Sequence, residues 1–140
     1  MRREGHEEYL KELGATRVVV SRNNRFHYGV QPVDLALDCV GTPTFNAALR
    51  CLRVGGRVII VGNVTSERSP VNLGHLITMG KSVIGPGGAN RSDMAALLAE
   101  HARKPFVSIV RESRPLSEAD AAQRQLLAGG QRGRIVLTVE

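Results

Sequence analysis

Residues 33–63 read VDLALDCVGTPTFNAALRCLRVGGRVIIVGN, and this stretch decides the fold class of the 140-residue chain. It opens with an almost continuous apolar run from Val33 to Val40, which is typical of a strand buried on both faces of a parallel sheet. Gly41 ends the run, and Thr42 and Pro43 are a favourable N-cap and a favourable first helical residue. We therefore expect a strand that leads directly into a helix.

The second half of the stretch returns the chain to the same sheet. Apolar residues recur at helical spacing after Pro43 and predict a helix that continues to about Arg53. Gly55 and Gly56 are expected to stop this helix. Arg57–Val61 then forms the next buried strand, and Gly62 closes it. The whole stretch predicts a strand, a helix and a parallel strand.

The same alternation extends in both directions along the chain. We expect helices over residues 6–13, 73–79 and 93–103, and a further helix that opens at 115–118, with Ser117 as its cap, and ends at Gly129. We expect strands over residues 17–20, 81–84, 106–110 and 134–139. The predicted fold class is α/β, an incomplete Rossmann-type parallel sheet flanked by helices.

Composition excludes several classes of function. Hydrophobic residues make up 42% of the chain and charged residues 23%, as in a globular protein. The net charge is +6, but the arginines are scattered and there are three Phe, two Tyr and no Trp for stacking on bases, so we expect no nucleic-acid partner. The apolar runs fall far short of the ~20 residues that cross a bilayer, so we expect no membrane partner. No signal-peptide pattern begins the sequence, and the expected location is the cytoplasm.

Side chains that ligate metals or act as nucleophiles form no recognisable set. Cys39 and Cys51 fit no metal or disulfide spacing, and we interpret them as reduced thiols, with a reactive role for Cys39 as the alternative. The four histidines share no ligand spacing with each other or with the cysteines, so we expect no metal site and no zinc. Asp38 lies at a strand end, where a hydrogen bond within its own loop is the expected role.

Several stretches together resemble one enzyme superfamily. They are YLKELGATRVV (9–19), VDLALDCVG (33–41), ALRCLRVGGRVIIVGN (48–63), VNLGHLITMGKSVIG (71–85) and PLSEADAAQRQLLAGGQRGRIVLTV (115–139). In order and spacing the chain resembles the C-terminal part of medium-chain dehydrogenases/reductases, the zinc-type alcohol dehydrogenase and quinone oxidoreductase superfamily. GNVTSERSPVN (62–72) is most similar to the acryloyl-CoA reductase-like branch.

The resemblance implies a cofactor, NADP or NAD, held at the carboxyl ends of the strands. It implies cofactor contacts from Arg22, Cys39, Val40, Gly41, Val61, Gly62, Asn63, Gly85 and Gly87. Ser21 departs from the tyrosine that precedes the arginine in quinone-reductase relatives, which leaves the choice between NADP and NAD open. At Gly41 and Gly62, cofactor contact and a simple strand-ending turn remain equal alternatives.

The resemblance also implies that parts of the enzyme lie outside this sequence. No G-x-G-x-x-G loop occurs in it, because Asn90 stands where the third glycine after Gly85 and Gly87 would fall. A phosphate site at residues 85–88 is the minor alternative to a plain turn. The separate N-terminal GroES-like domain is also missing, and the catalytic residues are unknown.

We therefore expect residues 1–140 to form a partial dinucleotide-binding domain, with 106–110 and 134–139 as strands that join the catalytic domain in a full-length relative. The expected function is that of a truncated NAD(P)-dependent oxidoreductase, inactive alone, whose complete relatives transfer hydride to a carbonyl, enone or enoyl-CoA. The alternative is a non-catalytic remnant or dimerisation module.

The expected partner is a second copy or a chain that carries the missing half. The strand order 3-2-1-4-5-6 would leave residues 33–40 at an exposed edge. We expect that edge to be covered by residues 17–20, by a second copy or by a separate chain.

Overall fold

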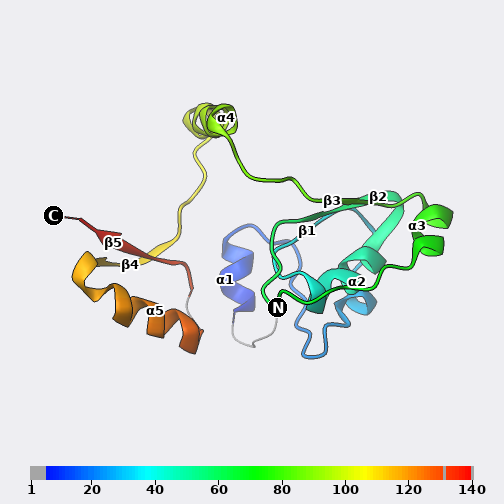
Figure 1. Ribbon diagram of the computed structural model, residues 1–140, viewed down its shortest axis with the longest axis horizontal. Helices are drawn as coiled ribbons and strands as arrows, with labels where there is room; N and C mark the ends of the chain where they lie inside the picture. The colour runs from blue at the N-terminus through cyan, green and yellow to red at the C-terminus, as the bar shows by residue number, and fades with distance from the viewer. Residues whose placement is uncertain (1–5, 131, 140) are drawn as a thin grey trace. The chain divides into compact units, whose positions relative to one another are not determined.

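The computed structural model describes residues 6–130 and 132–139. The chain divides into two compact units, Met1–Gly88 and Ala89–Glu140, and each is considered by itself (Figure 1). The first unit contains residues 33–63 and all of the expected site residues.

The first unit is a three-stranded parallel sheet with helices in its connections. The strands are β1 (Val33–Asp38), β2 (Leu52–Ile60) and β3 (Ser82–Ile84), in the order β1-β2-β3. The helical segments are α1 (Glu7–Glu12), the 3-10 helix η1 (Phe26–Gly29), α2 (Thr42–Cys51) and α3 (Leu73–Met79). This arrangement confirms the predicted α/β class.

A small apolar core lies between α2 and the sheet. Phe45, Ala48 and Leu49 of α2 pack with Leu52 and Val58 of β2, and Val58 is fully buried. The helical spacing that predicted α2 is therefore the spacing of its buried face. These contacts fix α2 beneath β1 and β2 and so position the loops at their ends.

Lys81, the residue before β3, is a buried cation that packs beside this core. Its Nζ donates to the carbonyl of Leu49, 3.0 Å away, in the last turn of α2, and lies 3.2 Å from Nε2 of His75 in α3. Burial lowers the pKa of Lys81. One side chain thus links both helices to the strand.

The boundaries of α2 differ from those expected. Gly41, with φ of 89°, is the N-cap, and Thr42 is already helical. The helix ends at Cys51, so Gly55 and Gly56 lie inside β2 rather than at a helix stop. The pairing shifts there, from Val33 opposite Leu52 to Leu35 opposite Arg57. Gly55 and Gly56 thus accommodate an irregularity in β2. Because glycine is typical both of such irregularities and of helix ends, the pair was predicted to end the helix.

The strand expected at residues 17–20 is absent from both sheets of the described chain. The β-branched run favours an extended backbone, but a strand also needs a neighbour along which to pair. Val19 instead lies against the backbone of Gly29 in η1, where an added Cβ would be 3.2 Å from its Cγ1. The expectation that this segment covers the edge of β1 is therefore wrong.

β1 is buried on only one face. Leu35 and Leu37 are 53% and 64% exposed, whereas Ala36 packs against the core next to α2. The apolar run of β1 predicted burial on both faces, and this expectation is wrong for the described chain. The difference arises because β1 is the edge strand of this sheet, as the expected strand order implies.

The second unit contains α4 (Arg91–Arg103), β4 (Val110–Pro115), the 3-10 helix η2 (Leu116–Glu118), α5 (Ala119–Ala128) and β5 (Arg134–Thr138). The strand expected at 106–110 begins only at Val110, where β4 pairs in parallel with β5. Ser117 does not cap α5, because η2 precedes that helix and Glu118 takes the N-cap position.

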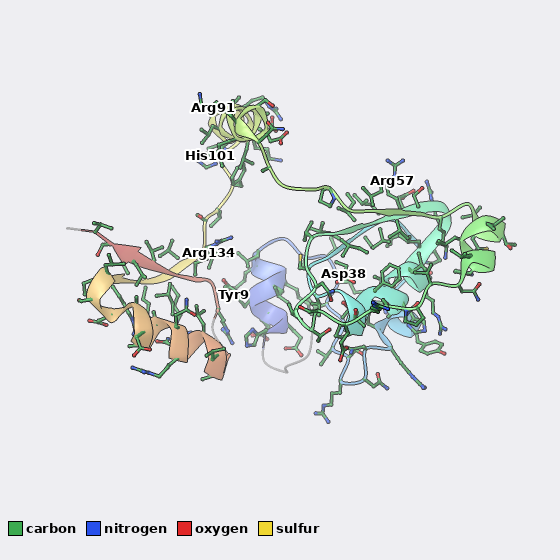
Figure 2. All side chains as sticks on the ribbon, viewed as in Figure 1. Tyr9, Asp38, Arg57, Arg91, His101 and Arg134 are labelled. Atoms are coloured by element: carbon green, nitrogen blue, oxygen red, sulfur yellow. The ribbon has the colours of Figure 1, made fainter. Side chains whose placement is uncertain are left out.

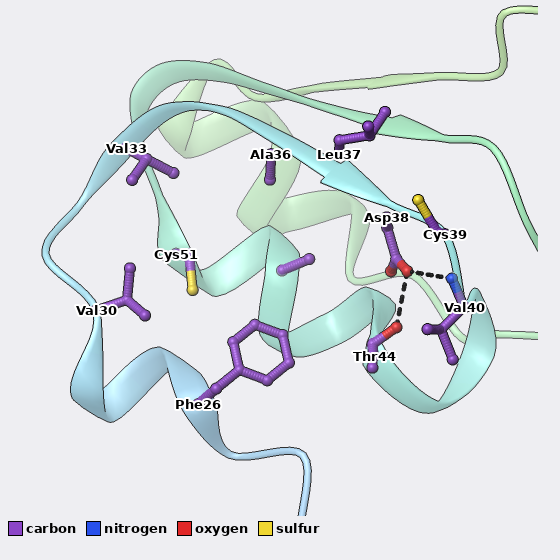
Figure 3. A pocket seen from close by; sticks show the side chains of 11 residues that line it. Phe26, Val30, Val33, Ala36, Leu37, Asp38, Cys39, Val40, Thr44 and Cys51 are labelled. Carbon is purple, nitrogen blue, oxygen red and sulfur yellow. Dashed lines mark hydrogen bonds between the residues drawn. The ribbon is translucent and has the colours of Figure 1, made fainter. Parts of the chain in front are cut away.

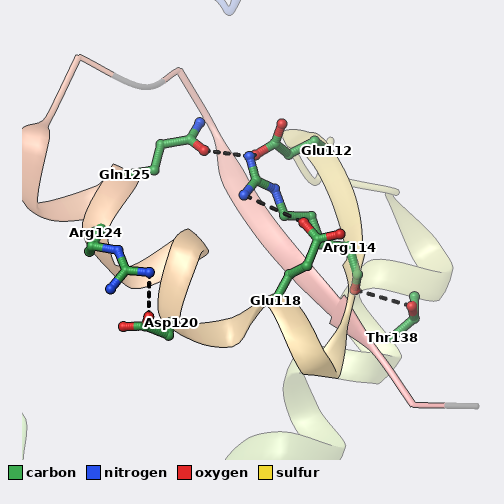
Figure 4. A network of polar contacts seen from close by, with 7 residues as sticks. All are labelled: Glu112, Arg114, Glu118, Asp120, Arg124, Gln125 and Thr138. Atoms are coloured by element: carbon green, nitrogen blue, oxygen red, sulfur yellow. Dashed lines mark hydrogen bonds and ion pairs between the residues drawn. The ribbon is translucent and has the colours of Figure 1, made fainter.

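Charged residues in β4 explain why the sequence pattern placed this strand at 106–110 instead of at Val110–Pro115. Arg114, the next-to-last residue of β4, has a side chain that is 22% exposed. Its Nη2 lies 2.8 Å from Glu112 and 2.5 Å from Oε1 of Gln125, while Nη1 lies 3.8 Å from Glu118 (Figure 4). A strand that orders an arginine through polar partners lacks the apolar alternation that identifies strands in a sequence.

The character of the helices and the burial of Asp38 both bear on function. Among the helices that the structure describes, none combines the length and the apolar character needed to cross a bilayer. Figure 2 shows Asp38 inside the first unit and Arg57 on its surface, in agreement with their buried and exposed states. Asp38 is the buried acid of the candidate site.

Candidate functional site

The loops that follow β1 and β2 form one edge of the first unit. Asp38 pairs with Ile60 at the ends of the two strands. The amide of Val61 donates to the carbonyl of Asp38, and the amide of Val64 donates to the carbonyl of Val40, each at an N···O distance of 2.9 Å. Ligands of open parallel sheets bind at such an edge, outside the carboxyl ends of the strands. The structure therefore joins the two loops that contain most of the expected site residues.

Gly41 and Gly62 lie where the two loops pass closest. A Cβ on Gly41 would be 2.7 Å from both Cα of Asn63 and the carbonyl oxygen of Gly62. A Cβ on Gly62 would be 2.8 Å from the carbonyl carbon of Cys39. Contact between the loops is thus sufficient to require glycine at both positions.

Asp38 organises the first of these loops. Its Oδ1 accepts from the amide of Val40 at 2.9 Å, the amide of Gly41 at 3.1 Å and Oγ1 of Thr44 at 2.8 Å (Figure 3). These bonds match the loop hydrogen bonding expected from the sequence and fix the turn into α2. Its other oxygen, Oδ2, is buried and has no hydrogen-bond partner among the described residues.

A cavity of about 250 Å³ opens at this edge. Its lining combines apolar side chains of α2, β2 and β3 with polar groups of the loops: Gly41, Thr42, Phe45, Ile60, Asn63, Glu67, Ser69, Val71 and Val83. Oγ1 of Thr42 donates to the carbonyl of Glu67 at 2.7 Å, and Nδ2 of Asn63 donates to the same oxygen at 3.4 Å. Oγ of Ser69, a residue of this lining, is buried and has no hydrogen-bond partner among the described groups.

A second cavity, of about 430 Å³, lies beneath β1. Its lining is largely apolar and includes the expected site residues Cys39 and Val40, together with Phe26, Val30, Val33, Ala36, Leu37, Asp38, Thr44, Ala48 and Cys51. Burial raises the pKa of the Cys51 thiol, which keeps it protonated near neutral pH. Cys51 is therefore an unreactive wall of this cavity.

The remaining expected residues lie elsewhere. Arg22 lines a separate hollow of about 580 Å³ together with Ser21 and Arg25. Gly85 and Gly87 follow β3, and a Cβ on either would meet no atom within 4 Å. The structure thus brings Gly41, Val61, Gly62 and Asn63 together, places Cys39 and Val40 beside them, and leaves Arg22 in a different hollow.

The phosphate alternative after β3 is disfavoured by the N-terminus of α4. Oδ1 of Asn90 accepts from the amides of Ser92 and Asp93, and the carboxylate of Asp93 accepts from the amide of Asn90. This capping box satisfies the N–H groups that would bind an anion and adds a negative charge beside them. The described residues also contain no group of three or more His, Cys, Asp or Glu side chains placed to hold a metal ion.

Sequence reasoning missed Thr42 and Ser69 as cavity residues, and it missed the carbonyl of Glu67 as the acceptor for Thr42 and Asn63. Thr42 was interpreted only as a cap. Residues 62–72 did give a signal, because their polar sequence marks a loop at a strand end, but spacing alone does not show which of its side chains turn inward.

Comparison with known proteins agrees with this geometry. Residues 2–103 match the model of a family described as "Zinc-binding dehydrogenase". Over 125 residues, the chain is 30% identical to the acryloyl-coenzyme A reductase of Metallosphaera sedula, a match that covers 89% of this chain and 38% of that protein.

Solved structures show the same fold. The crystal structure of AibC superposes with a TM-score of 0.82 at 32% identity, over 94% of this chain and 38% of that one. The 2-octenoyl-CoA carboxylase reductase CinF, solved with NADP and 2-octenoyl-CoA, gives a TM-score of 0.67 at 26% identity, over 74% of this chain and 24% of that one. The chain spans less than two-fifths of the length of each of these relatives. It belongs to the zinc-binding dehydrogenase family, within the medium-chain dehydrogenase/reductase superfamily that the sequence resembles.

Proposed function

We propose that this chain supplies the nicotinamide-side wall of an NAD(P)-dependent oxidoreductase. The observation that carries the proposal is the 250 Å³ cavity at the carboxyl edge of the sheet, which Gly41, Asn63 and the unpartnered hydroxyl of Ser69 line. Its position matches the general site of ligand binding in open parallel sheets.

The groups at this edge fit a nicotinamide. A carboxamide needs both a hydrogen-bond donor and an acceptor, and the Ser69 hydroxyl supplies either. The apolar side chains of Phe45, Ile60 and Val83 offer a surface for the ring. The bound cofactor supplies hydride chemistry, while these residues orient its ring and exclude water.

The proposed reduction acts on an enoyl-CoA, with a carbonyl or enone as alternatives. Support comes from the acryloyl-coenzyme A reductase of M. sedula and from CinF, whose structure holds NADP and 2-octenoyl-CoA. The proposed cofactor is NADP, with NAD as the alternative. Arg22 supports NADP through its charge, since its hollow also contains Arg25.

In this proposal the chain supplies the nicotinamide-side wall but has no loop of its own that binds the cofactor's pyrophosphate. The 140 residues contain no G-x-G-x-x-G loop, and the N-terminus of α4 is satisfied internally. We therefore propose that the chain by itself is inactive and that activity needs a further polypeptide or a second copy. We expect no zinc and a cytoplasmic location, and Gly85 and Gly87 remain proposed contacts beside the nicotinamide.

The second candidate is a non-catalytic module without cofactor affinity. It is favoured by one observation, that contact between the loops already requires glycine at positions 41 and 62 without any ligand. A neighbouring reading frame that encodes a GroES-like domain and a G-x-G-x-x-G loop would favour the enzyme, and its absence would favour the module.

A chimera tests the proposal. The residues of the M. sedula reductase that align with this chain are replaced by those of this chain, and NADPH and NADH binding are measured by titration calorimetry. We expect micromolar binding of one cofactor and a loss of about tenfold with Ser69→Ala, the size of one good hydrogen bond. Ser66→Ala, an exposed change in the same loop, is the matched control. A folded chimera that binds neither cofactor would refute the proposed function.

A further inference from the structure

We propose that Thr42 and Asn46 are positioning residues of the cavity at the carboxyl edge of the sheet, because they hold the loop of residues 64–71 in the conformation that completes its wall. Neither side chain needs to touch a cofactor in this role, since each acts through a carbonyl of the loop. The proposal deepens the proposed function and rests on it, because it takes the ligand of this cavity to be the nicotinamide ring.

The first observation is the hydroxyl of Thr42, which α2 does not use. Gly41 takes the N-cap position of that helix, and the described side chains form no cap hydrogen bond there. Oγ1 of Thr42 instead donates to the carbonyl of Glu67, 2.7 Å away, and lies 3.4 Å from Oδ1 of Asn63. A hydroxyl has one hydrogen, and the shorter contact takes it. The donor of Thr42 is therefore committed to the loop.

Asn46 repeats this arrangement one turn further along α2. Residues four apart lie on the same side of a helix, so Asn46 and Thr42 face the same way. Nδ2 of Asn46 donates to the carbonyl of Pro70 at 3.4 Å. Asn46 is exposed and, unlike Thr42, does not line the cavity. α2 thus holds the loop at two carbonyls, and Asn46 acts on the cavity only through the loop.

The loop of residues 64–71 has little structure of its own to fix its shape. It belongs to no helix or strand. The amide of Ser66 donates to the carbonyl of Asn63 at 3.3 Å, and Ser66 has a φ of 55°. A residue other than glycine costs free energy in this left-handed region, and surrounding contacts must offset that cost. The bonds from α2, together with the one from Nδ2 of Asn63 to the carbonyl of Glu67, are such contacts.

The shape of the loop matters to the cavity because the loop forms part of its wall. It supplies three residues of the lining, which are Glu67, Ser69 and Val71. Without the donor of Thr42 these residues lose their fixed positions, while the walls from α2 and β2 keep theirs. A loosened wall must be ordered when a ring binds, and that ordering reduces affinity. The loss is confined to ligands that occupy this cavity.

The first experiment uses the 140-residue chain without cofactor. Thr42→Val keeps the shape of the side chain and removes the donor, and we expect exchange of the Ser66 amide to quicken about fivefold, the size of one hydrogen bond. Thr42→Ser restores the hydroxyl and should return the rate to within about twofold of wild type. Thr65→Val, the same change at an exposed position of the loop, is the matched control. Exchange of the Val61 amide, which donates to Asp38 outside the loop, should stay unchanged in every variant.

The second experiment measures binding to the chimera with the M. sedula reductase. Calorimetry compares the nicotinamide cofactor with ADP-ribose, with or without the 2′-phosphate to match, which lacks the nicotinamide ring. We expect Thr42→Val to weaken cofactor binding about fivefold and Asn46→Ala about two- to fivefold, with the affinity for ADP-ribose unchanged. A general loss of stability would weaken both ligands equally. Asn46→Ala also covers the case in which Thr42→Val does not fold, since Asn46 is exposed.

The outcomes separate this inference from the proposed function. Unchanged cofactor affinity in the folded variants would overturn the positioning role and leave the function standing, as would an equal loss for ADP-ribose. A loss with Thr42→Val but not with Asn46→Ala, at an unchanged exchange rate for Ser66, would show that Thr42 contacts the ligand itself and would overturn it too. A folded chimera that binds neither cofactor would refute the function, and with it the role toward the nicotinamide, while the exchange rates would still decide whether α2 holds the loop.

Discussion

The candidate site depends on single residues at the carboxyl edge of the sheet. Among them, Gly62 leaves the least room for a side chain. A Cβ at this position meets the backbone of Cys39, which lies in the loop that Asp38 orders. We expect Gly62→Ala to lower the free energy of unfolding by about 1–3 kcal/mol, as overpacking does. Gly85→Ala is the matched control, because nothing lies within 4 Å of its added Cβ. Equal denaturation midpoints for the two variants would show that the loops are not in contact.

A second prediction at this scale concerns His27. Burial lowers its pKa from 6.5, and the positive charges of Arg50 and Arg25 lower it further. The unfolded chain therefore binds the proton more readily, so the contribution of His27 to stability is lost as the pH falls from above 6.5 through the lowered pKa. We expect His27→Gln to reduce the fall in stability between about pH 7 and pH 5, measured by urea denaturation.

If His27→Gln showed the same slope as wild type, the histidine would be as well solvated in the folded state as in the unfolded one.

At the scale of elements, α4 offers a test of local structure. Its capping box depends on Asn90, whose Oδ1 accepts from two amides of the first turn. We expect Asn90→Ala to destabilise the helix by about 1 kcal/mol, because those N–H groups lose their acceptor. Amide exchange in the first half of the helix should then accelerate about fivefold. Arg91→Ala, at the neighbouring exposed position, should have little effect, and equal rates in both variants would contradict the capping role.

Elements also show how far sequence reasoning reached. Apolar spacing and end signals locate the strands at 33–38 and 134–138 and the helices at 42–51, 73–79 and 91–103. In α2 the apolar spacing reflects a buried face, whereas α3 and α4 have first-turn amides that Asn72 and Asn90 cap. Arg17–Val20 was misjudged because local preference for an extended backbone does not supply a pairing partner. The predicted position of β4 was wrong because Arg114 is ordered by ion pairs, which a hydrophobic pattern does not reveal.

The sequence predicted the backbone positions of the candidate site but not the orientations of its side chains. Gly41, Val61, Gly62 and Asn63 were found because the ends of parallel strands meet at one edge. The roles of Ser69 and Lys81 were not found, because each depends on which way a side chain turns after a loop. The unpartnered Oδ2 of Asp38 likewise depends on atomic geometry rather than on residue type.

At the scale of the whole molecule, the chain combines a cavity of about 250 Å³ at the carboxyl edge of its sheet with an unprotected strand edge. The family match establishes what kind of fold this is, while the M. sedula reductase and AibC both extend well beyond the matched part. The central claim is that this chain is a half-site, able to orient a nicotinamide but unable to hold the pyrophosphate without further polypeptide.

The most direct test is titration calorimetry of NADPH and NADH into the purified 140-residue chain, with its mass in solution measured alongside. We expect a folded chain that binds neither cofactor at millimolar concentration. Micromolar binding to this chain alone would contradict the account, because it would mean that a phosphate grip exists within these 140 residues or across a dimer of them.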